Sequence, residues 1–290
     1  MTGFLSELGK KAAERWLALL VVPGLLFLGL AWATWVMRRH GTWFDPGPVG
    51  TEVQHWEGKK SGPLFLAVAG VLIGAAGTAL LAQGTGTAVE RLWFAQRLGP
   101  VGSWLTARRL DSWQAKDGDY EKALFARYRG GSVADPEVVL AARNRVCLVS
   151  PARPTWMADR VRAVGERVHL AYDLDVSSLW PRLWLTVPDA ARTELVAART
   201  ALARDARIFA WGLFYLVPAI WWWPAGFITA VTCTVAWGRA RSATDVLADL
   251  AESAVDLYAP ALAGQLGIAA PDGLTAEVGL EITERLRKDG

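Results

Sequence analysis

Cysteine and histidine are scarce in this 290-residue sequence, and the motifs that bind metals or carry out common reactions are missing. The two cysteines, Cys147 and Cys233, do not indicate a disulfide framework or a cysteine-based metal site. The three histidines lack the spacing of a metal-binding pair such as H-E-x-x-H. There is neither a phosphate loop with its lysine nor a Gly-x-Ser-x-Gly nucleophile elbow. The sequence therefore predicts no cofactor, no metal and no catalytic residue, and it favours a protein that is not an enzyme.

Charged residues are also missing from four apolar runs. The first two are each about 20 residues long, which matches the ~30 Å hydrocarbon core of a bilayer. The last two are shorter and meet at a proline, so they predict a hairpin that either spans the membrane or enters and returns. Because ionisable residues inside a membrane usually mark transport paths, their absence argues against a proton-coupled transporter. The four runs are Trp16–Met37, Pro63–Gln83, Ile208–Trp223 and Pro224–Trp237.

The rest of the sequence is polar and its apolar residues follow helical spacing. We therefore predict an all-α polytopic membrane protein with about four transmembrane helices and a helical cytoplasmic body. The hydrophobic fraction of 52% and the 16 tryptophans agree with this class, because tryptophan favours the membrane–water interface. The predicted parts are a two-span region at 1–83, a cytoplasmic body at 84–207, a membrane hairpin at 208–238 and cytoplasmic C-terminal helices at 239–290.

The charges that flank the hairpin predict its orientation. Its two ends carry Arg204, Arg207, Arg239 and Arg241, whereas its turn is uncharged. Lysine and arginine remain on the cytoplasmic side, so both ends of the hairpin, and with them the N- and C-termini of the chain, are predicted to be cytoplasmic. The loop at 38–62 would then lie outside, although it has basic residues of its own, which argue for the opposite orientation.

Two local patterns predict how the runs pack and where they end. Gly70, Gly74 and Gly77 lie on or near one face of the second run, and small residues allow helices to approach closely. We expect them to form a packing seam against another span, with a dimer interface as the alternative. In the hairpin, three consecutive tryptophans precede Pro224. We interpret Trp221, Trp222 and Trp223 as an interface belt at the turn, rather than as an aromatic cage for a cation.

The segment from Ser150 to Asp189 has a distinctive motif. Pro-Thr precedes a helix with an Ala-Asp pair and an Arg-Ala step, and a Tyr-x-hydrophobic-Asp element and Trp-Pro-Arg-Leu follow. This pattern resembles a motif in a family of uncharacterised bacterial multi-pass membrane proteins, in which a membrane hairpin comes next. The resemblance covers about 150–237 and implies the same architecture in a bacterial inner membrane, but no reaction. The matching residues are Pro154, Thr155, Ala158, Asp159, Arg162, Ala163, Tyr172, Asp175, Trp180, Pro181, Arg182 and Leu183.

The polar residues of this motif favour a structural role. Thr155 is placed to cap a helix over 156–170, and Asp175 a short helix over 176–180 that Pro181 ends or kinks. Asp159 can pair with Arg162, and Arg182 with a nearby carboxylate, so these residues predict a polar clamp between helices. The alternative is a phosphate or lipid-headgroup site, for which the sequence offers Arg160, Arg162, Arg167 and Arg182.

Further along, Asp245, Asp249, Glu252 and Asp256 recur at helical spacing. We interpret them as a solvated helix face; a divalent metal site is the alternative.

These features predict a protein that acts by interaction, as an anchor, scaffold or membrane-acting effector. A pore formed by several copies is a second hypothesis. A lipid-active enzyme is a third, for which Asp159, Asp173 and Asp175 are the only candidate group. The expected partners are the lipid bilayer, anionic lipid headgroups, and either another protein or further copies of the chain. No nucleic acid is expected, because the basic and aromatic residues form no binding motif.

Overall fold

The computed structural model describes residues 21–39, 45–57, 61–129 and 135–287, and all regular structure in these ranges is helical. The prediction of an all-α fold is therefore confirmed for the described residues. Residues 16–20 of the first predicted run, and residues 40–44 and 58–60 of the loop predicted to lie outside the membrane, are not among them. By length and composition, one described helix is able to cross a membrane, over Phe65–Trp93. The four-span topology remains a prediction.

The chain divides into two compact units, and each unit combines two separate stretches of the sequence. Unit 1 consists of the described residues within 1–90 and 203–238, and unit 2 of those within 91–202 and 239–290. The sequence placed these divisions at 83/84, 207/208 and 238/239. The first two divisions lie elsewhere, at 90/91 inside α4 (Ser61–Trp93) and at 202/203 inside α9 (Asp189–Phe214), whereas the third coincides with the predicted 238/239, inside α11 (Pro224–Gln265).

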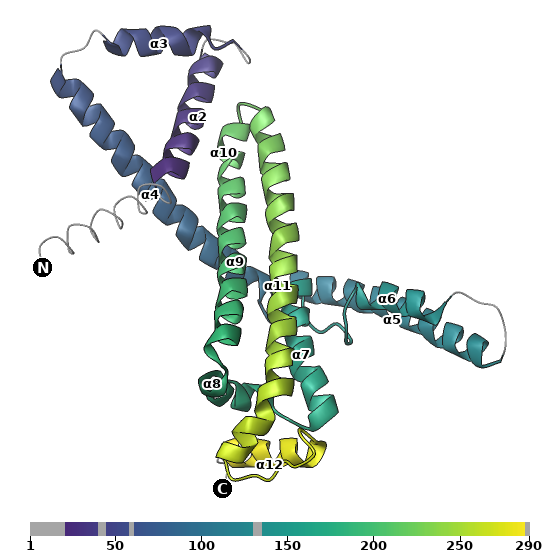
Figure 1. The fold of residues 1–290 in the computed structure, drawn as a ribbon. Helices are drawn as coiled ribbons and strands as arrows, with labels where there is room; N and C mark the ends of the chain where they lie inside the picture. The colour runs from purple at the N-terminus through teal and green to yellow at the C-terminus, as the bar shows by residue number, and fades with distance from the viewer. Residues whose placement is uncertain (1–20, 40–44, 58–60, 130–134, 288–290) are drawn as a thin grey trace, which may run out of the picture. The chain divides into compact units, whose positions relative to one another are not determined.

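Unit 1 contains α2 (Val22–Arg39), α3 (Gly47–Glu57), most of α4 (Ser61–Trp93), the end of α9 (Asp189–Phe214), α10 (Leu216–Ala219) and the start of α11 (Pro224–Gln265), all labelled in Figure 1. Helix α11 begins at Pro224, where the sequence placed the hairpin turn. The two arms are in contact, because a Cβ on Gly212 of α9 would lie 2.7 Å from the Sγ of Cys233 on α11.

Helix α4 packs through a different face from the predicted glycine seam. Its buried side contains Ala75, Ala79 and Ala82. Next to Ala75, a Cβ added to Gly24 of α2 would meet the Ala75 carbonyl oxygen at 2.3 Å. The helices therefore touch backbone to backbone at this point, which small residues permit.

Of the three predicted seam glycines, only Gly74 faces a neighbour within the described chain. A Cβ on Gly74 would lie 3.3 Å from Leu28, whereas one on Gly70 or Gly77 meets no atom within 4 Å. The contact differs from the predicted one because α4 has small residues on two faces, glycines on one and alanines on the other. Helix α2 packs on the alanine face.

The three hairpin tryptophans also differ from one another. The indole N–H of Trp221 donates to Thr34 Oγ1 of α2 at 3.0 Å, and the Trp221 ring is half-buried. Trp222 is half-buried too, whereas Trp223 is 63% exposed. Trp221 therefore takes part in helix packing inside unit 1, which an interface belt alone does not require. Trp223 is the one with the exposure that an interface position needs.

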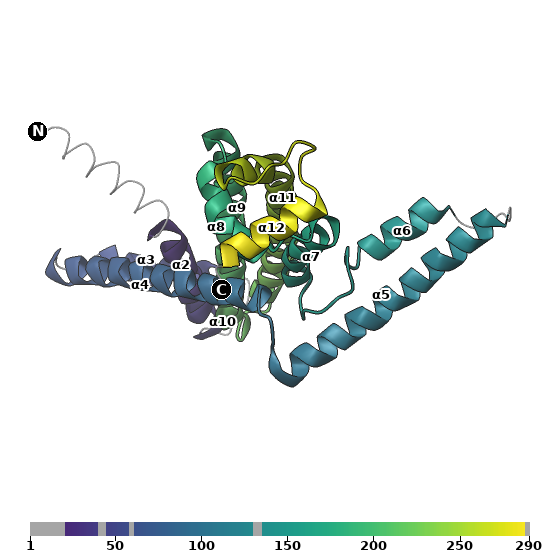
Figure 2. The same cartoon turned by 90° about the horizontal axis from the view of Figure 1, so that it is seen from below.

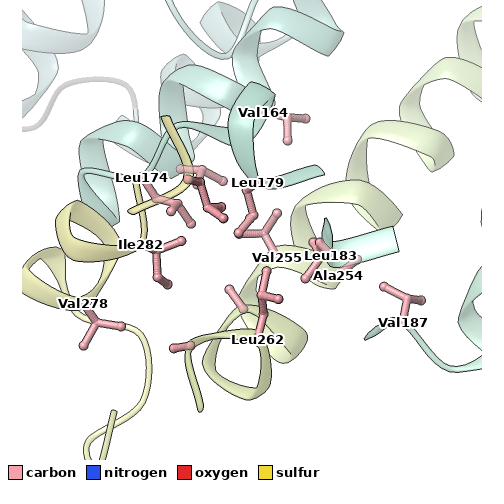
Figure 3. Packing of buried hydrophobic residues seen from close by; sticks show 14 of the residues in the cluster. Val164, Leu174, Leu179, Leu183, Val187, Ala254, Val255, Leu262, Val278 and Ile282 are labelled. Carbon is pink, nitrogen blue, oxygen red and sulfur yellow. The ribbon is translucent and has the colours of Figure 1, made fainter. Parts of the chain in front are cut away.

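Unit 2 contains α5 (Gly99–Tyr128), α6 (Pro136–Asn144), α7 (Trp156–Tyr172), α8 (Val176–Thr186), α12 (Ala276–Arg287) and the unit's parts of α9 and α11. Helices α5 and α6 lie side by side, as Figure 2 shows, and α12 packs on α7 and α8. The apolar core joins α7, α8, α11 and α12, with Leu174, Leu179, Leu183, Val255 and Ile282 at its centre (Figure 3).

The predicted helix starts in unit 2 are confirmed. Thr155 Oγ1 accepts from the Ala158 N–H at the start of α7, and Asp175 accepts from the Ser177 N–H at the start of α8. Helix α8 does not end at Pro181, however, and continues to Thr186. Its continuation buries Leu183 in the core, so tertiary packing outweighs the local cost of a proline inside the helix.

Candidate functional site

Asp159 lies at the centre of a buried polar cluster in unit 2. Its Oδ2 accepts from Arg109 Nη1 of α5 at 2.7 Å, and its Oδ1 accepts from the backbone N–H groups of Ala152 and Arg153 at 3.0 Å. The predicted pair with Arg162 is present but longer, at 3.4 Å. Asp159 is completely buried. These contacts hold α5, the segment before α7, and α7 itself together, as expected of a clamp between helices.

Arg109 extends the same cluster to the segment between α6 and α7. Its Nη1 also donates to the Arg153 carbonyl at 2.9 Å, and its Nη2 to the Val146 carbonyl at 3.3 Å. Next to it, Trp113 Nε1 donates to the Cys147 carbonyl at 2.9 Å. Arg109 was missed by sequence reasoning, because it lies 50 residues before Asp159 and no local spacing signals the pair.

Asp175 belongs to a second cluster. It accepts from Ser178 Oγ at 2.7 Å and from the Ser177 N–H at 3.0 Å, and Arg287 of α12 lies 3.4 Å away. The hydrogen bond from Ser178 is the main reason that the pKa of Asp175 is lowered; the Ser177 N–H and Arg287 contribute, and partial burial opposes them. The backbone N–H of Asp175 donates to Thr283 of α12 at 3.0 Å. This cluster joins α8 to α12.

The four predicted clamp residues therefore do not form one site. Asp159 and Arg162 lie near the start of α7, whereas Asp175 follows its end, and the stretch of helix from Asp159 to Tyr172 is roughly 20 Å long. Arg182 donates to the Ser178 carbonyl of its own helix at 2.8 Å, and this is not the carboxylate partner predicted for it. Asp173, which terminates α7 in a left-handed conformation, pairs with His169 at 3.3 Å.

The acidic stripe of α11 faces arginines of α7. Arg160 pairs with Asp245 at 2.5 Å and also with Asp249, and Arg167 pairs with Glu252 at 3.0 Å. The stripe is therefore partly neutralised by α7 and is not a purely solvated face. Within the described residues, no three His, Cys, Asp or Glu side chains gather as a metal site.

A large apolar groove opens in unit 2, lined by α7, α8, α9, α11 and the last residue of α12. It has a volume of about 1120 Å³. Arg162, Glu166, Arg199 and Arg287 lie among its polar lining residues. We call this surface the apolar groove. The apolar lining residues are Val161, Val164, Leu174, Val176, Trp180, Trp184, Leu195, Val196, Leu247, Ala248 and Ala251.

A second pocket, of about 870 Å³, is rich in arginine, and we call it the arginine pocket. Arg241 of α11 lies over the Trp156 ring, with its guanidinium carbon 4.3 Å from the ring centre. Burial lowers the pKa of Arg241, and the charge of Arg109 adds to this effect, while Asp245 opposes it. Burial also raises the pKa of the Cys147 thiol in the same pocket, together with the charge of Asp159. The other charged lining residues are Arg145, Arg160, Arg167, Asp245 and Asp249.

Comparison of the chain with protein families, with curated proteins and with solved structures found no match. The resemblance to the family of bacterial multi-pass membrane proteins therefore stays a prediction from the motif alone. The function is therefore inferred from the exposed surfaces and the pockets of the two units.

Proposed function

We propose that this chain is an integral membrane protein that acts by interaction, with unit 1 in the bilayer and unit 2 as the body that binds a partner. The observation that carries this proposal is the surface of α4. Only 17% of its most apolar 18-residue window is buried within the chain. Phe65, Leu66 and Ile73 are each exposed over more than two thirds of their surface. Soluble proteins rarely expose so long an apolar surface, because about 25 cal/mol is lost for each Å² left in water.

Other helices of unit 1 support the same placement. Ile220 and Phe227 near the hairpin turn are also largely exposed, as is Leu26 of α2. A bilayer would cover these side chains together with α4. The arginines at the ends of the hairpin favour a cytoplasmic body, and the motif resemblance favours a bacterial inner membrane.

The apolar groove supports interaction as the activity of the body. A mainly apolar lining that includes two tryptophans and several charged residues suits the apolar face of an amphipathic helix. We therefore propose a partner protein that inserts such a helix between α7, α8, α9 and α11, which makes the chain an anchor or scaffold for that partner.

The test is affinity purification of the full-length protein in mild detergent, with mass spectrometry and particle mass measured together. Ala251 lines the groove, so Ala251→Trp would place a bulky side chain in it. Ala261 lies on the same helix, is exposed and does not line the groove, so Ala261→Trp is the matched control. We expect a stoichiometric partner with the wild type and the control, and its loss with Ala251→Trp. Equal recovery with both variants would contradict the groove as the binding surface.

The two alternatives from the sequence lead to different results. A pore predicts a homo-oligomer without a partner, and ion leak from liposomes that contain only this protein. A lipid-active enzyme needs its acidic residues at one place, but Asp159 lies at one end of α7, and Asp173 and Asp175 at the other. The geometry therefore gives these three aspartates no shared site.

A further inference from the structure

The arginine pocket shares no lining residue with the apolar groove. Its lining arginines come from three places in the sequence: Arg145 follows α6, Arg160 and Arg167 are on α7, and Arg241 is on α11. Asp245 and Asp249 are the only acidic side chains in its lining. Arg160 pairs with both aspartates and Arg167 with Glu252, so four arginines face three carboxylates in and beside the pocket, all within unit 2.

Arg160 provides an independent sign that the pocket takes a ligand. Its side chain is 6% exposed, and Asp245 and Asp249 bind its Nε and Nη2. Its Nη1 is buried and has no hydrogen-bond acceptor among the described residues. An unpaired guanidinium N–H in a buried position loses its hydration without recovering a bond, so an oxygen from a ligand would remove a real cost.

Arg241 and Arg145 complete the pocket. Arg241 is held in position by the Trp156 ring and has no carboxylate within ion-pair distance among the described residues. Arg145 is exposed, and its side chain has no hydrogen-bond or ion-pair partner among the described residues. Since Arg109 adds further positive potential at Arg241, an anion in the pocket would relieve repulsion between guanidinium groups.

We propose that this pocket binds a phosphate group, which the guanidinium groups of Arg145, Arg160 and Arg241 contact. A phosphate offers several acceptor oxygens in a tetrahedral arrangement and carries more charge than a carboxylate, so it matches several converging guanidinium groups. The phosphate belongs either to a lipid headgroup or to a soluble phosphorylated compound. The proposal differs from the headgroup site suggested by the sequence, because Arg162 and Arg182 lie outside this pocket.

The experiment uses the full-length protein in a phosphate-free neutral detergent, dodecyl maltoside, and inorganic phosphate as the probe. Binding is titrated by calorimetry at constant ionic strength made up with chloride, because a general salt effect must be separated from a site. The test variants are Arg241→Gln and Arg145→Gln. Arg108→Gln is the matched control, because Arg108 also lies over a tryptophan ring, that of Trp104, but outside the pocket.

We expect saturable binding to the wild type and to Arg108→Gln, and at least a tenfold rise in Kd for each test variant. Circular dichroism must show that the variants keep their helical content; Arg145→Gln retains the test if Arg241→Gln does not fold, because Arg145 is exposed. No saturable binding by the wild type, or equal affinity of the test variants and the control, would overturn the proposal. Failure here leaves the membrane placement and the groove untouched, because neither depends on this pocket.

A second arm distinguishes the source of the phosphate. The titration is repeated after phosphatidylglycerol is added to the micelles. A fall in the apparent affinity for inorganic phosphate, absent with a neutral diacylglycerol, identifies a lipid headgroup as the competing ligand. Unchanged affinity with both lipids assigns the pocket to a soluble phosphorylated compound.

Discussion

Arg109 and Asp159 are 50 positions apart in the sequence, and they form a 2.7 Å ion pair in unit 2. The aspartate is completely buried, and its other oxygen accepts two backbone N–H groups from the segment before α7. A buried carboxylate is tolerated when all of its neighbours donate to it. This pair therefore fixes the position of α7, which contributes residues to both pockets.

Replacing Asp159 with alanine should destabilise unit 2 strongly. The change leaves a largely buried guanidinium and two backbone N–H groups without their acceptor, so we expect a loss of about 3–5 kcal/mol. Thermal unfolding in detergent, followed by circular dichroism, measures the loss. Asp119→Ala is the control, because its pair with Lys122 is exposed and worth about 1 kcal/mol or less. Equal shifts in melting temperature for the two variants would contradict the account.

The contact between α2 and α4 should not tolerate a side chain at Gly24. In Gly24→Ala the new Cβ would lie 2.3 Å from the Ala75 carbonyl oxygen, so the helices must move apart. We expect a loss of about 1–3 kcal/mol, as for other overpacked contacts. Gly70→Ala meets no atom within 4 Å and should be neutral or stabilising by up to about 1 kcal/mol, because alanine favours helix. The same thermal assay checks both; a destabilised Gly70→Ala would restore the predicted glycine seam.

The three tryptophans at the hairpin should respond differently to substitution. Trp221→Phe removes the hydrogen bond to Thr34 and should lower stability by about 1 kcal/mol or more. Trp223→Phe keeps an aromatic ring at an exposed position and should have a smaller effect. Thr34→Val completes a double-mutant cycle. The loss of stability in the double variant should be smaller than the sum of the losses in Thr34→Val and Trp221→Phe. Full additivity of the two changes would mean that the bond contributes nothing.

Asp175 should make the stability of unit 2 depend on pH in the acidic range. Its pKa in the folded protein is lowered from 3.8, chiefly by the bond from Ser178, so the unfolded chain binds its proton more readily. The contribution of Asp175 is therefore fully present above pH 3.8 and is lost as the pH falls below it. Denaturant unfolding measured from pH 6 to well below pH 3.8 should show a flatter profile below pH 3.8 for Asp175→Asn than for the wild type. Parallel pH profiles for the two proteins would mean that Asp175 does not contribute to the pH dependence of stability.

Local features of the sequence predicted local features of the fold. Thr155, Asp175 and Pro224 mark helix starts because a cap or a proline acts on the first turn next to it. The Asp159–Arg162 pair was predictable for the same reason, as the two residues share one helix. Pairs between distant segments could not be predicted from residue spacing. Examples are Arg109 with Asp159 and Asp245 with Arg160.

Two further features were beyond the sequence because competing faces had similar composition. Helix α4 has both a glycine stripe and an alanine stripe, and only the position of α2 decides which is buried. Each pocket combines residues from segments that are 80 positions or more apart in the sequence, so no single stretch of sequence predicts either pocket. Of the arginines suggested for a headgroup site, Arg160 and Arg167 line the arginine pocket, Arg162 lines the apolar groove, and Arg182 lines neither, for the same reason.

The central claim is that unit 1 lies in a bilayer, and extraction of native membranes with alkaline carbonate tests it most directly. Alkaline carbonate releases proteins held by charge or by a protein partner, but not those whose apolar helices lie in the hydrocarbon core. The account predicts that the full-length protein remains in the membrane pellet after carbonate and is released by detergent. Recovery of the folded protein in the carbonate supernatant would contradict it, and would mean that another protein covers the apolar face of α4.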